Sequence, residues 1–235
     1  MKIVGFYFVA LIFDNWDKIV NEQITKILNS DLFKITNELN IRVYYEKEKD
    51  FLEFKNFLKN QPKIKITSTT SNEHEYGILQ LIEDKSNIDN FYCYYLHSKG
   101  VSITPNTMKK HKLDISFEQM TNSIESWRRY MEYFLIDRYK ECIEILDNGF
   151  DGCGVQLRGT PRKNTLHFSG NFWWSKSEYI KKLPKLETFD KENRNEPEFW
   201  IGYGYGNFKN LYFTKQAGYQ TIISENYKQT SIKTK

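Results

Sequence analysis

Cysteine is scarce in this sequence, and long hydrophobic runs are missing. The three cysteines, Cys93, Cys142 and Cys153, lie far apart in a chain of 235 residues and form no CxxC pair. This pattern argues against a disulfide framework and a cysteine zinc site, and it favours reduced thiols in the cytoplasm. The apolar stretch at residues 3–13 is too short to span a bilayer and has neither the basic segment nor the cleavage site of a signal peptide. We therefore expect a cytoplasmic protein without a transmembrane segment.

Several common motifs are also absent. The chain has no GxGxxG after its first apolar run, and no P-loop, HExxH or GxSxG sequence. The first absence disfavours a dinucleotide-binding fold. The four histidines show no ligand spacing, which disfavours a structural zinc site.

The charge is small and evenly spread. The net charge is +4, and the lysines are not gathered on one segment. This permits an anionic ligand or peripheral contact with a negative membrane surface, and demands neither. Apolar residues make up 40% of the chain and charged residues 27%, as in a globular protein. The length suits one large domain or a closely fused pair.

Apolar runs and helical periodicities alternate along the first hundred residues. They predict strands at residues 2–11, 41–45, 64–66 and 91–96, with helices at 16–28, 50–58 and 75–83 between them. Such alternation is typical of a parallel sheet with helical crossovers. We therefore predict an α/β protein with a Rossmann-like, mostly parallel central sheet flanked by helices, in a single domain.

The second half begins with a long helical stretch. Ser116 and Gln119 have the spacing of a capping box, and the helix is expected to bend near Asp137 and to end at Gly149. Further expected elements are strands at residues 151–155, 166–174, 211–213 and 219–223, a helix starting near Pro197, a mobile loop at 100–113 and a frayed tail from 225.

Polar residues follow the buried run at 91–96. His97, Lys99 and Gly100 stand there, and ligands of open α/β sheets bind at the carboxyl ends of strands. A lysine charge and backbone N–H groups can hold a diphosphate. The alternative is an inert turn with Lys99 in solvent and His97 on the surface.

A second cluster lies near residue 170 and includes adjacent tryptophans. His167, Gly170 and Asn171 precede Trp173 and Trp174. Neighbouring residues of a strand point to opposite faces, so we expect one tryptophan in the core and the other in a cleft, where its face can pack on a sugar ring.

Two carboxylates open the helix expected near Pro197. Glu196 and Glu198 can supply a general base, and they can equally serve as helix N-terminal charges that complement the helix dipole. Both readings stay open from the residues alone.

Five segments together resemble one family. They are Asn15-Trp16 with residues 19–24, Tyr95-Leu96-His97-Ser98-Lys99-Gly100, Trp127-Arg128-Arg129-Tyr130, His167-Phe168-Ser169-Gly170-Asn171-Phe172-Trp173-Trp174 and Glu198-Phe199-Trp200-Ile201-Gly202. In order and spacing they are similar to a Y-L-H-x-K-G group of GT-A-type glycosyltransferases, related to rhamnan-synthesis proteins and to capsule and large-DNA-virus glycan transferases.

The resemblance implies a GT-A-like fold and an enzyme that moves a hexose or deoxyhexose from a nucleotide-diphosphate sugar, with a UDP-type donor favoured, to a glycan hydroxyl. It implies a nucleotide-binding half at residues 1–100, an acceptor and sugar half at 101–224 and a tail at 225–235. The expected partners are a nucleotide sugar and a glycan acceptor, with no nucleic acid.

Read with that resemblance, the candidate residues take roles. We expect the donor to contact Asn72 and Tyr76 through its nucleoside, His97, Lys99 and Gly100 through its diphosphate, and Gly170, Asn171, Trp173 and Trp174 through its sugar, with His167 as a further donor-binding residue. The expected base is Glu198, with Glu196 and then Asp151 as alternatives, and Trp127 and Arg128 are expected to border the acceptor.

The sequence departs from the GT-A pattern at the metal site. Where a DxD motif would hold a divalent ion, it has His97-Ser98-Lys99. Dependence on Mn²⁺ or Mg²⁺ is therefore undecided: Lys99 can supply the positive charge, or His97 can be one ligand. Two other classes stay open, a catalytically degenerate protein that binds glycan or nucleotide sugar, and a nucleic-acid-binding protein.

Overall fold

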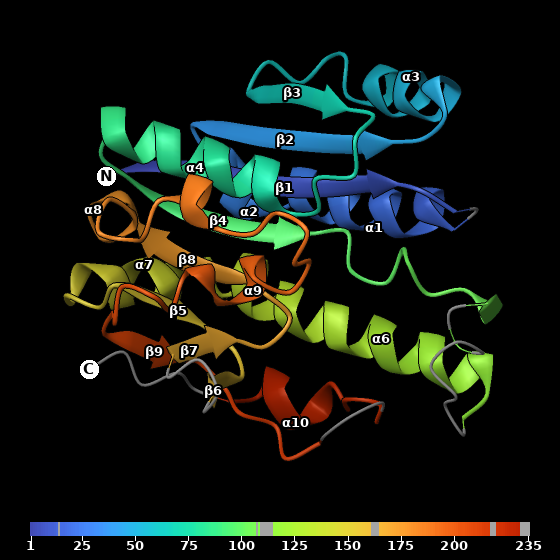
Figure 1. Cartoon of the computed structure of the whole chain (residues 1–235). Coiled ribbons are helices and arrows are strands. Elements are labelled where there is room, and N and C mark those ends of the chain that lie inside the picture. The colour runs from blue at the N-terminus through green and yellow to red at the C-terminus, as the bar shows by residue number, and fades with distance from the viewer. Residues whose placement is uncertain (14, 107, 109–114, 161–164, 217–219, 231–235) are drawn as a thin grey trace.

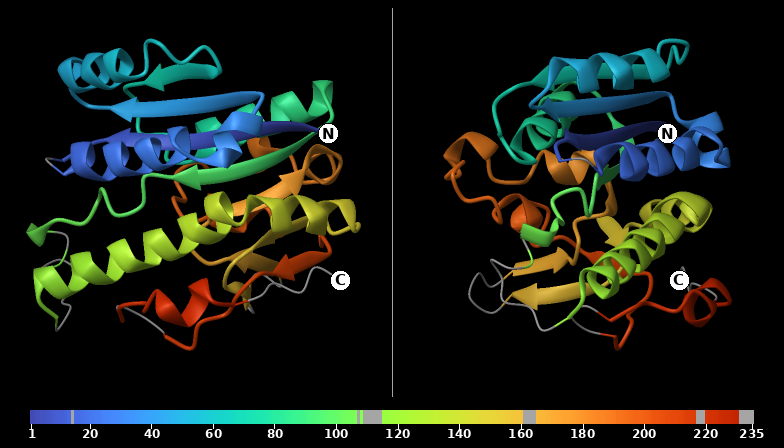
Figure 2. Two further views of the ribbon diagram at one scale, coloured as in Figure 1. Left: turned by 180° about the vertical axis from the view of Figure 1, so that it is seen from behind. Right: turned by 90° about the vertical axis from the view of Figure 1, so that its right-hand side faces the viewer.

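The computed structural model describes residues 1–13, 15–106, 108, 115–160, 165–216 and 220–230. Over these ranges the chain forms a seven-stranded sheet with helices on both faces and a separate two-stranded ribbon (Figure 1, Figure 2). The prediction of a mixed α/β domain with a large, mostly parallel sheet is confirmed.

The sheet has two parts that meet at the β4–β8 pair. Its order is β3-β2-β1-β4-β8-β5-β9. The first four strands are mutually parallel, β8 is antiparallel to both β4 and β5, and β5 is parallel to β9. The strands are β1 (Lys2–Leu11), β2 (Glu38–Tyr45), β3 (Ile64–Thr69), β4 (Phe91–His97), β5 (Gly152–Gly154), β8 (Trp173–Lys176) and β9 (Phe208–Asn210). The ribbon pairs β6 (Leu157–Thr160) with β7 (Thr165–Phe168) in antiparallel register.

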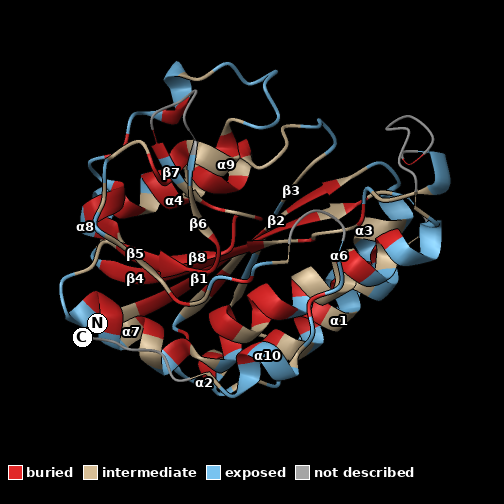
Figure 3. Ribbon diagram, turned by 90° about the horizontal axis from the view of Figure 1, so that it is seen from below, coloured by how far each residue is buried: buried red, intermediate tan, exposed pale blue. Residues whose placement is uncertain are grey.

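Helices cover the two faces of the sheet in separate groups, as Figure 3 shows from below. One face carries α1 (Trp16–Leu28), α2 (Asp31–Ile35), α3 (Glu48–Phe57), α6 (Phe117–Glu132), the π-helical turn η1 (Tyr133–Asp137), α7 (Tyr139–Asp147) and α10 (Glu225–Lys228). The other carries α4 (Tyr76–Ile88), α8 (Ser177–Ile180), the 3₁₀ turn η2 (Leu186–Thr188) and α9 (Pro197–Trp200).

β1 after Lys2 and β4 before His97 carry no charged side chain, because both of their faces are covered. In β1, Tyr7 and Val9 pack into the core under α1 and α6, while Val4 and Phe6 pack into the core under α4. A strand buried on both faces needs apolar side chains at every position, so it reads as a continuous run and not as an alternation.

The long helix of the second half follows the sequence closely. Ser116 and Gln119 form the expected capping box at the start of α6. The expected bend is the π-helical turn that ends at Asp137, where an extra residue in the turn redirects the axis between α6 and α7. The helical stretch ends before Gly149, whose φ of 93° lies in the left-handed region that glycine tolerates.

Several expected elements are wrong in the C-terminal part. The stretch at 166–174 is two strands, because Gly170 and Asn171 both adopt positive φ and break it between β7 and β8. The strand expected at 211–213 lies three residues earlier as β9, and residues 220–223 form no strand, while residue 219 lies outside the described residues. The tail contains α10, whose Tyr227 is buried against Tyr130. Of the loop expected at 100–113, residues 100–106 and 108 are described, and 107 and 109–113 lie outside the described residues.

The tryptophan pair of β8 does not reach a cleft. Trp173 and Trp174 do point to opposite faces of the sheet, as their positions predict. Both faces are covered by helices, however, and the two side chains are 1% and 0% exposed. Trp173 stacks at a tilt against Tyr95, and Trp174 donates its indole N–H to the carbonyl of Leu135 at 2.9 Å. The expected sugar-pocket role of both residues is therefore corrected to a core role.

This arrangement predicts equal behaviour for the two tryptophans. Trp173→Ala and Trp174→Ala should each lower the free energy of unfolding by about 3–5 kcal/mol, because each removes a fully buried ring. Phe57→Ala, at an exposed aromatic position on α3, is the matched control and should change stability little. Chemical denaturation of the three variants measures this, and a Trp variant as stable as Phe57→Ala would contradict the core assignment.

Candidate functional site

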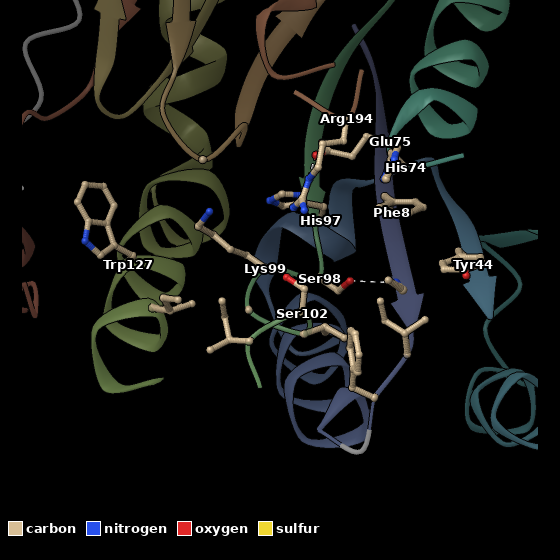
Figure 4. Close-up of a pocket in the computed structure, with 18 of the residues that line it drawn as sticks. Phe8, Tyr44, His74, Glu75, His97, Ser98, Lys99, Ser102, Trp127 and Arg194 are labelled. Carbon is tan, nitrogen blue, oxygen red and sulfur yellow. Dashed lines mark hydrogen bonds and ion pairs between the residues drawn. The ribbon is translucent and has the colours of Figure 1, made fainter. Parts of the chain in front are cut away.

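A cavity of about 780 Å³ opens at the carboxyl ends of β1 and β4 (Figure 4). Its floor comes from the parallel strands, and one wall comes from α6, with Met120 and Trp127. The polar and charged residues that line it include Asn72, His74, Glu75, His97, Ser98, Lys99, Arg158 and Arg194. These side chains come from both halves of the sequence, so folding alone brings them together.

The position of the cavity follows from the strand order. The chain runs outward from β1 to β2 and β3, then returns to place β4 on the other side of β1. The connections that leave β1 and β4 therefore diverge and leave a crevice at their carboxyl ends, which is where open α/β sheets bind ligands.

Lys99 projects its ammonium group into the cavity (Figure 4). Over the described ranges, Nζ of Lys99 makes no hydrogen bond or ion pair. Burial lowers the pKa of this amine, while the nearby carboxylates of Glu198 and Glu75 oppose that shift. A partly buried cation without a direct partner is costly unless an anion can reach it, so the cavity is suited to an anionic ligand.

Glu75 is a buried carboxylate that several donors surround. It accepts hydrogen bonds from the Tyr95 hydroxyl and, at 2.7 Å, from Nδ2 of Asn171, and its Oε1 lies 3.2 Å from Nδ1 of His97. Burial by itself would raise the pKa of Glu75, but His97 and the hydrogen bonds from His97, Tyr95 and Asn171 together lower it to about 2. Glu75 is therefore ionised at neutral pH.

The backbone at the end of β4 is held by the side chains of Ser98, which follows the strand, and Gln23 on α1. Ser98 Oγ accepts a hydrogen bond from the backbone N–H of Ala10 at 2.9 Å, shown dashed in Figure 4. The buried amide of Gln23 donates to the carbonyl of His97 at 3.2 Å and accepts from the Tyr7 hydroxyl at 3.0 Å. These contacts fix the segment that carries His97 and Lys99.

Two glycines shape the wall beside Lys99. Gly100 has a φ of 102°, and a Cβ there would lie 3.0 Å from a methyl group of Ile124. Gly170 has a φ of 90°, and a Cβ there would lie 2.5 Å from Sδ of Met131 and 3.7 Å from Cε of Lys99. The backbone N–H of Gly170 donates to Oε1 of Glu198 at 3.1 Å, so Glu198 lies directly behind this wall.

The structure brings six of the predicted site residues to the cavity. Asn72, His97, Lys99, Gly100, Gly170 and Trp127 all line it. Asn72 comes from the loop after β3, and Trp127 lies on α6, so the nucleoside and acceptor ends of the prediction fall on opposite walls of one cavity.

Other predicted donor residues are placed behind the cavity. Tyr76 is buried and donates its hydroxyl to the carbonyl of Asp190 at 2.8 Å, which holds the loop that carries Arg194. Asn171 is buried and bridges Glu75 and the Trp173 indole. His167 packs edge-on against Phe199, with ring centroids 5.0 Å apart. These three are corrected from direct donor contacts to supporting positions.

Arg128 does not border an acceptor. Its side chain is 3% exposed and lies between α1 and α6, with Nη2 2.5 Å from the Glu22 carboxylate and Nε 3.5 Å from Glu132. Arg128 therefore forms a buried ion pair that joins α1 and α6. Its position on α6 directs it toward α1, while the adjacent Trp127 faces the cavity.

None of the three expected bases lines the cavity: Glu198 lies behind Gly170, and the two alternatives have other contacts. Glu196 accepts hydrogen bonds from the Tyr203 hydroxyl and from Nδ2 of Asn193, at 2.5 and 3.1 Å. Asp151 lies at the amino end of β5, where its carboxylate accepts from the backbone N–H of Asn207 and lies 3.4 Å from Nζ of Lys176. Because β5 runs in the same direction as β4, Asp151 is at the edge of the sheet opposite Lys99, and its assignment as a base is corrected.

Sequence reasoning missed Glu75, His74, Arg158 and Arg194 as lining residues. Glu75 precedes a helix and looks like an ordinary N-terminal charge. Arg158 lies on the β6–β7 ribbon, and Arg194 lies on the loop before α9. No local sequence pattern predicts that these two segments return to the sheet. Only the motif at His97 could have suggested that a buried carboxylate must lie near.

The fold and the cavity define an α/β protein with a cationic crevice at the switch point of its sheet. The chain belongs to the family described as "Domain of unknown function (DUF8361)", whose model matches residues 10–221.

Other comparisons add little. No curated protein matches the chain. Its structure is similar to the crystal structure of HddC from Yersinia pseudotuberculosis, with a TM-score of 0.42, 12% sequence identity, and coverage of 92% of this chain and 91% of HddC. A likeness of this degree does not bear on activity. Among the described helices, none is long and apolar enough to cross a membrane.

The geometry at Gly170 yields a stability prediction. Gly170→Ala should lower the free energy of unfolding by about 1–3 kcal/mol, because alanine is strained at positive φ and its methyl group would overlap Met131. Gly159→Ala is the control, since a Cβ at Gly159 meets nothing within 4 Å. Thermal unfolding compares the two, and equal melting temperatures would show that the wall at Gly170 is not constrained as described.

Proposed function

We propose that this protein is a GT-A-type glycosyltransferase that moves a hexose or deoxyhexose from a nucleotide-diphosphate sugar to a hydroxyl group of a glycan. The observation that carries the proposal is the ammonium group of Lys99, which has no direct partner among the described residues and points into a cavity at the switch point of the sheet. The resemblance of the segment at residues 95–100 to the Y-L-H-x-K-G group supports the same assignment.

The size and charge of the cavity suit such a donor. A volume of about 780 Å³ falls within the usual range for sites that enclose a cofactor-sized ligand. The side chains of Lys99, Arg158 and Arg194 bring three positive charges to the lining, against one lining carboxylate, Glu75, among the described residues. Charge-assisted hydrogen bonds to phosphate oxygens are the strong contacts that this surplus offers.

The proposed donor lies across the parallel strands. Its nucleoside would lie toward Tyr44 and Asn72, its diphosphate beside His97 and Lys99, and its sugar toward Trp127, where α6 closes the cavity. In this orientation the acceptor enters from the side of α6. A UDP-type donor remains the favoured choice from the resemblance.

A divalent metal does not fit the described residues. They contain no group of three or more His, Cys, Asp or Glu residues placed to hold a metal ion. The one described carboxylate in the lining, Glu75, already accepts hydrogen bonds from Tyr95 and Asn171 and faces His97. The proposed mechanism therefore assigns the positive charge beside the diphosphate to protein side chains.

Binding of nucleotide sugars to wild-type protein and to Lys99→Ala tests the proposal. Calorimetric titration with UDP-, GDP- and dTDP-linked sugars, with and without Mn²⁺, should find a donor whose affinity falls about tenfold or more in Lys99→Ala, because a charged hydrogen bond contributes roughly 1.5–3 kcal/mol. Lys182→Ala is the control: it removes the same charge from an exposed residue beyond α8, at the opposite end of β4.

Three outcomes separate the candidate functions. Transfer from the bound donor to a glycan supports the enzyme, and binding without transfer to any acceptor would make the protein a nucleotide-sugar binder. Failure to bind any nucleotide sugar, together with salt-sensitive binding of nucleic acid, would overturn the proposal.

Glu198 is the proposed base. The acceptor oxygen would attack the anomeric carbon and pass its proton to Glu198, while the bond from that carbon to the diphosphate breaks and its electron pair goes to the phosphate oxygen. The position of Glu198 behind Gly170 and near Lys99 places a carboxylate next to the cavity wall.

Glu198→Gln tests this role. The amide oxygen can still accept from the Gly170 N–H, but the basic oxygen is lost, so transfer should fall about 10²–10⁴-fold with donor affinity nearly unchanged. Steady-state rates and calorimetry measure the two effects. Glu196→Gln is the comparison: a rate loss there with normal turnover in Glu198→Gln would assign the base to Glu196.

A further inference from the structure

The two ring nitrogens of His97 have different surroundings. Nδ1 lies 3.2 Å from Oε1 of Glu75, whereas Nε2 is buried and has no hydrogen-bond partner among the described residues. The ring is held edge-on against Phe172, with centroids 5.4 Å apart and an interplanar angle of 73°. Because His97 lines the cavity, a ligand there can supply the partner that Nε2 lacks.

Glu75 fixes which nitrogen carries the first proton. Its carboxylate is ionised and can only accept hydrogen bonds, so Nδ1 of His97 must be the donor between them. Tyr95 and Asn171 donate to the other carboxylate oxygen and keep it in place. In the neutral imidazole, Nε2 is therefore an acceptor without a donor among the described residues.

Charged and titratable groups surround the His97 ring. The titratable and charged side chains on the surrounding elements are Glu75 and His74 before α4, Tyr95 on β4, Lys99 after it, Arg158 on β6, Arg194 before α9 and Glu198 on α9. Three of these, Lys99, Arg158 and Arg194, are cations that line the cavity. An anion bound among them needs a donor at Nε2, which only the imidazolium provides, and Glu75 then faces the imidazolium from behind.

We propose that Glu75 and His97 form a proton-coupled anion site, in which binding of a diphosphate-linked sugar draws one proton onto Nε2 of His97. The imidazolium and the Lys99 ammonium then hold the diphosphate together. This inference rests on the proposed function for the identity of the anion. Glu75 acts here as a positioning residue, and His97 as a residue that contacts the donor.

The paired cations also fit the transfer step. When the bond between the anomeric carbon and the phosphate oxygen breaks, its electron pair adds negative charge to the departing diphosphate. The N–H of the His97 imidazolium and the Lys99 ammonium offset that charge, while the acceptor proton goes to Glu198. His97 returns its extra proton to solvent when the nucleoside diphosphate leaves.

Calorimetry in buffers of different ionisation enthalpy tests this coupling. UDP-glucose is the first probe, with GDP-mannose and dTDP-rhamnose beside it, because their diphosphates are diesters that do not titrate near neutral pH. Wild-type protein at pH 7.5 should take up at most about one proton per ligand bound, because Nε2 has to gain a proton before it can donate to the diphosphate. His97→Gln keeps an N–H donor and should bind with no uptake.

Two further variants separate positioning from folding. Glu75→Gln should bind with reduced proton uptake, because the imidazolium loses its counter-charge, and its melting temperature shows whether it is folded. If Glu75→Gln does not fold, His97→Asn supplies the second measurement and should also bind without uptake. His74→Gln removes the other described imidazole of the lining and should keep the wild-type uptake.

The outcomes distinguish this inference from the proposed function. Binding of a nucleotide sugar with no proton uptake by wild-type protein, or with uptake that persists in His97→Gln and is lost in His74→Gln, overturns the inference and leaves the function standing. Failure of the wild-type protein to bind any of the three sugars overturns both.

Discussion

The buried carboxylate of Glu75 is the constraint on which the arrangement of the site depends. A negative charge inside a protein is tolerated only when donors and cations surround it, and here the donors come from β4 and from the turn before β8. Tyr95 and His97 belong to the parallel part of the sheet, whereas Asn171 stands where the antiparallel part begins. The contacts with the Glu75 carboxylate therefore fix the parallel and antiparallel parts of the sheet relative to each other.

The same contacts explain the backbone of the β7–β8 turn. Asn171 adopts a φ of 57°, an uncommon conformation for a residue other than glycine, and its side chain bridges Glu75 and the Trp173 indole. The turn that aims this amide at Glu75 also places Gly170 beside the Lys99 stem. The conformation of the β7–β8 turn therefore positions both Asn171 behind the cavity and Gly170 in its lining.

Local patterns in the sequence predicted the parallel half well. β1 and β4 read as continuous apolar runs because both faces are buried, and the capping box at Ser116 marks its helix through short-range hydrogen bonds. His97 and Lys99 were found because they follow a buried strand. Each of these signals is contained within a few consecutive residues.

The errors arise where distant segments decide the outcome. Whether Trp173 and Trp174 meet solvent depends on which helices cover β8, and those helices lie before and after it in the chain. Asp151 sits at the far edge of the sheet because β5 follows the direction of β4, which the sequence of β5 does not encode. Glu75 resembles any helix-start acid until β4 and Asn171 close around it.

The loop before α9 shows how such a site can diversify. Tyr76 holds it through the backbone carbonyls of Asp190 and Asn193, and the side chains at 191–195 are exposed apart from their contribution to the rim at Arg194. Hydrogen bonds to backbone carbonyl oxygens do not depend on which side chain the accepting residue carries. Asn193 is the exception, because its side chain bonds the backbone N–H of Asn195 and the Glu196 carboxylate. The other residues of this segment can change in related chains without loosening the loop, so the residues at the rim of the cavity can vary while the underlying fold stays the same.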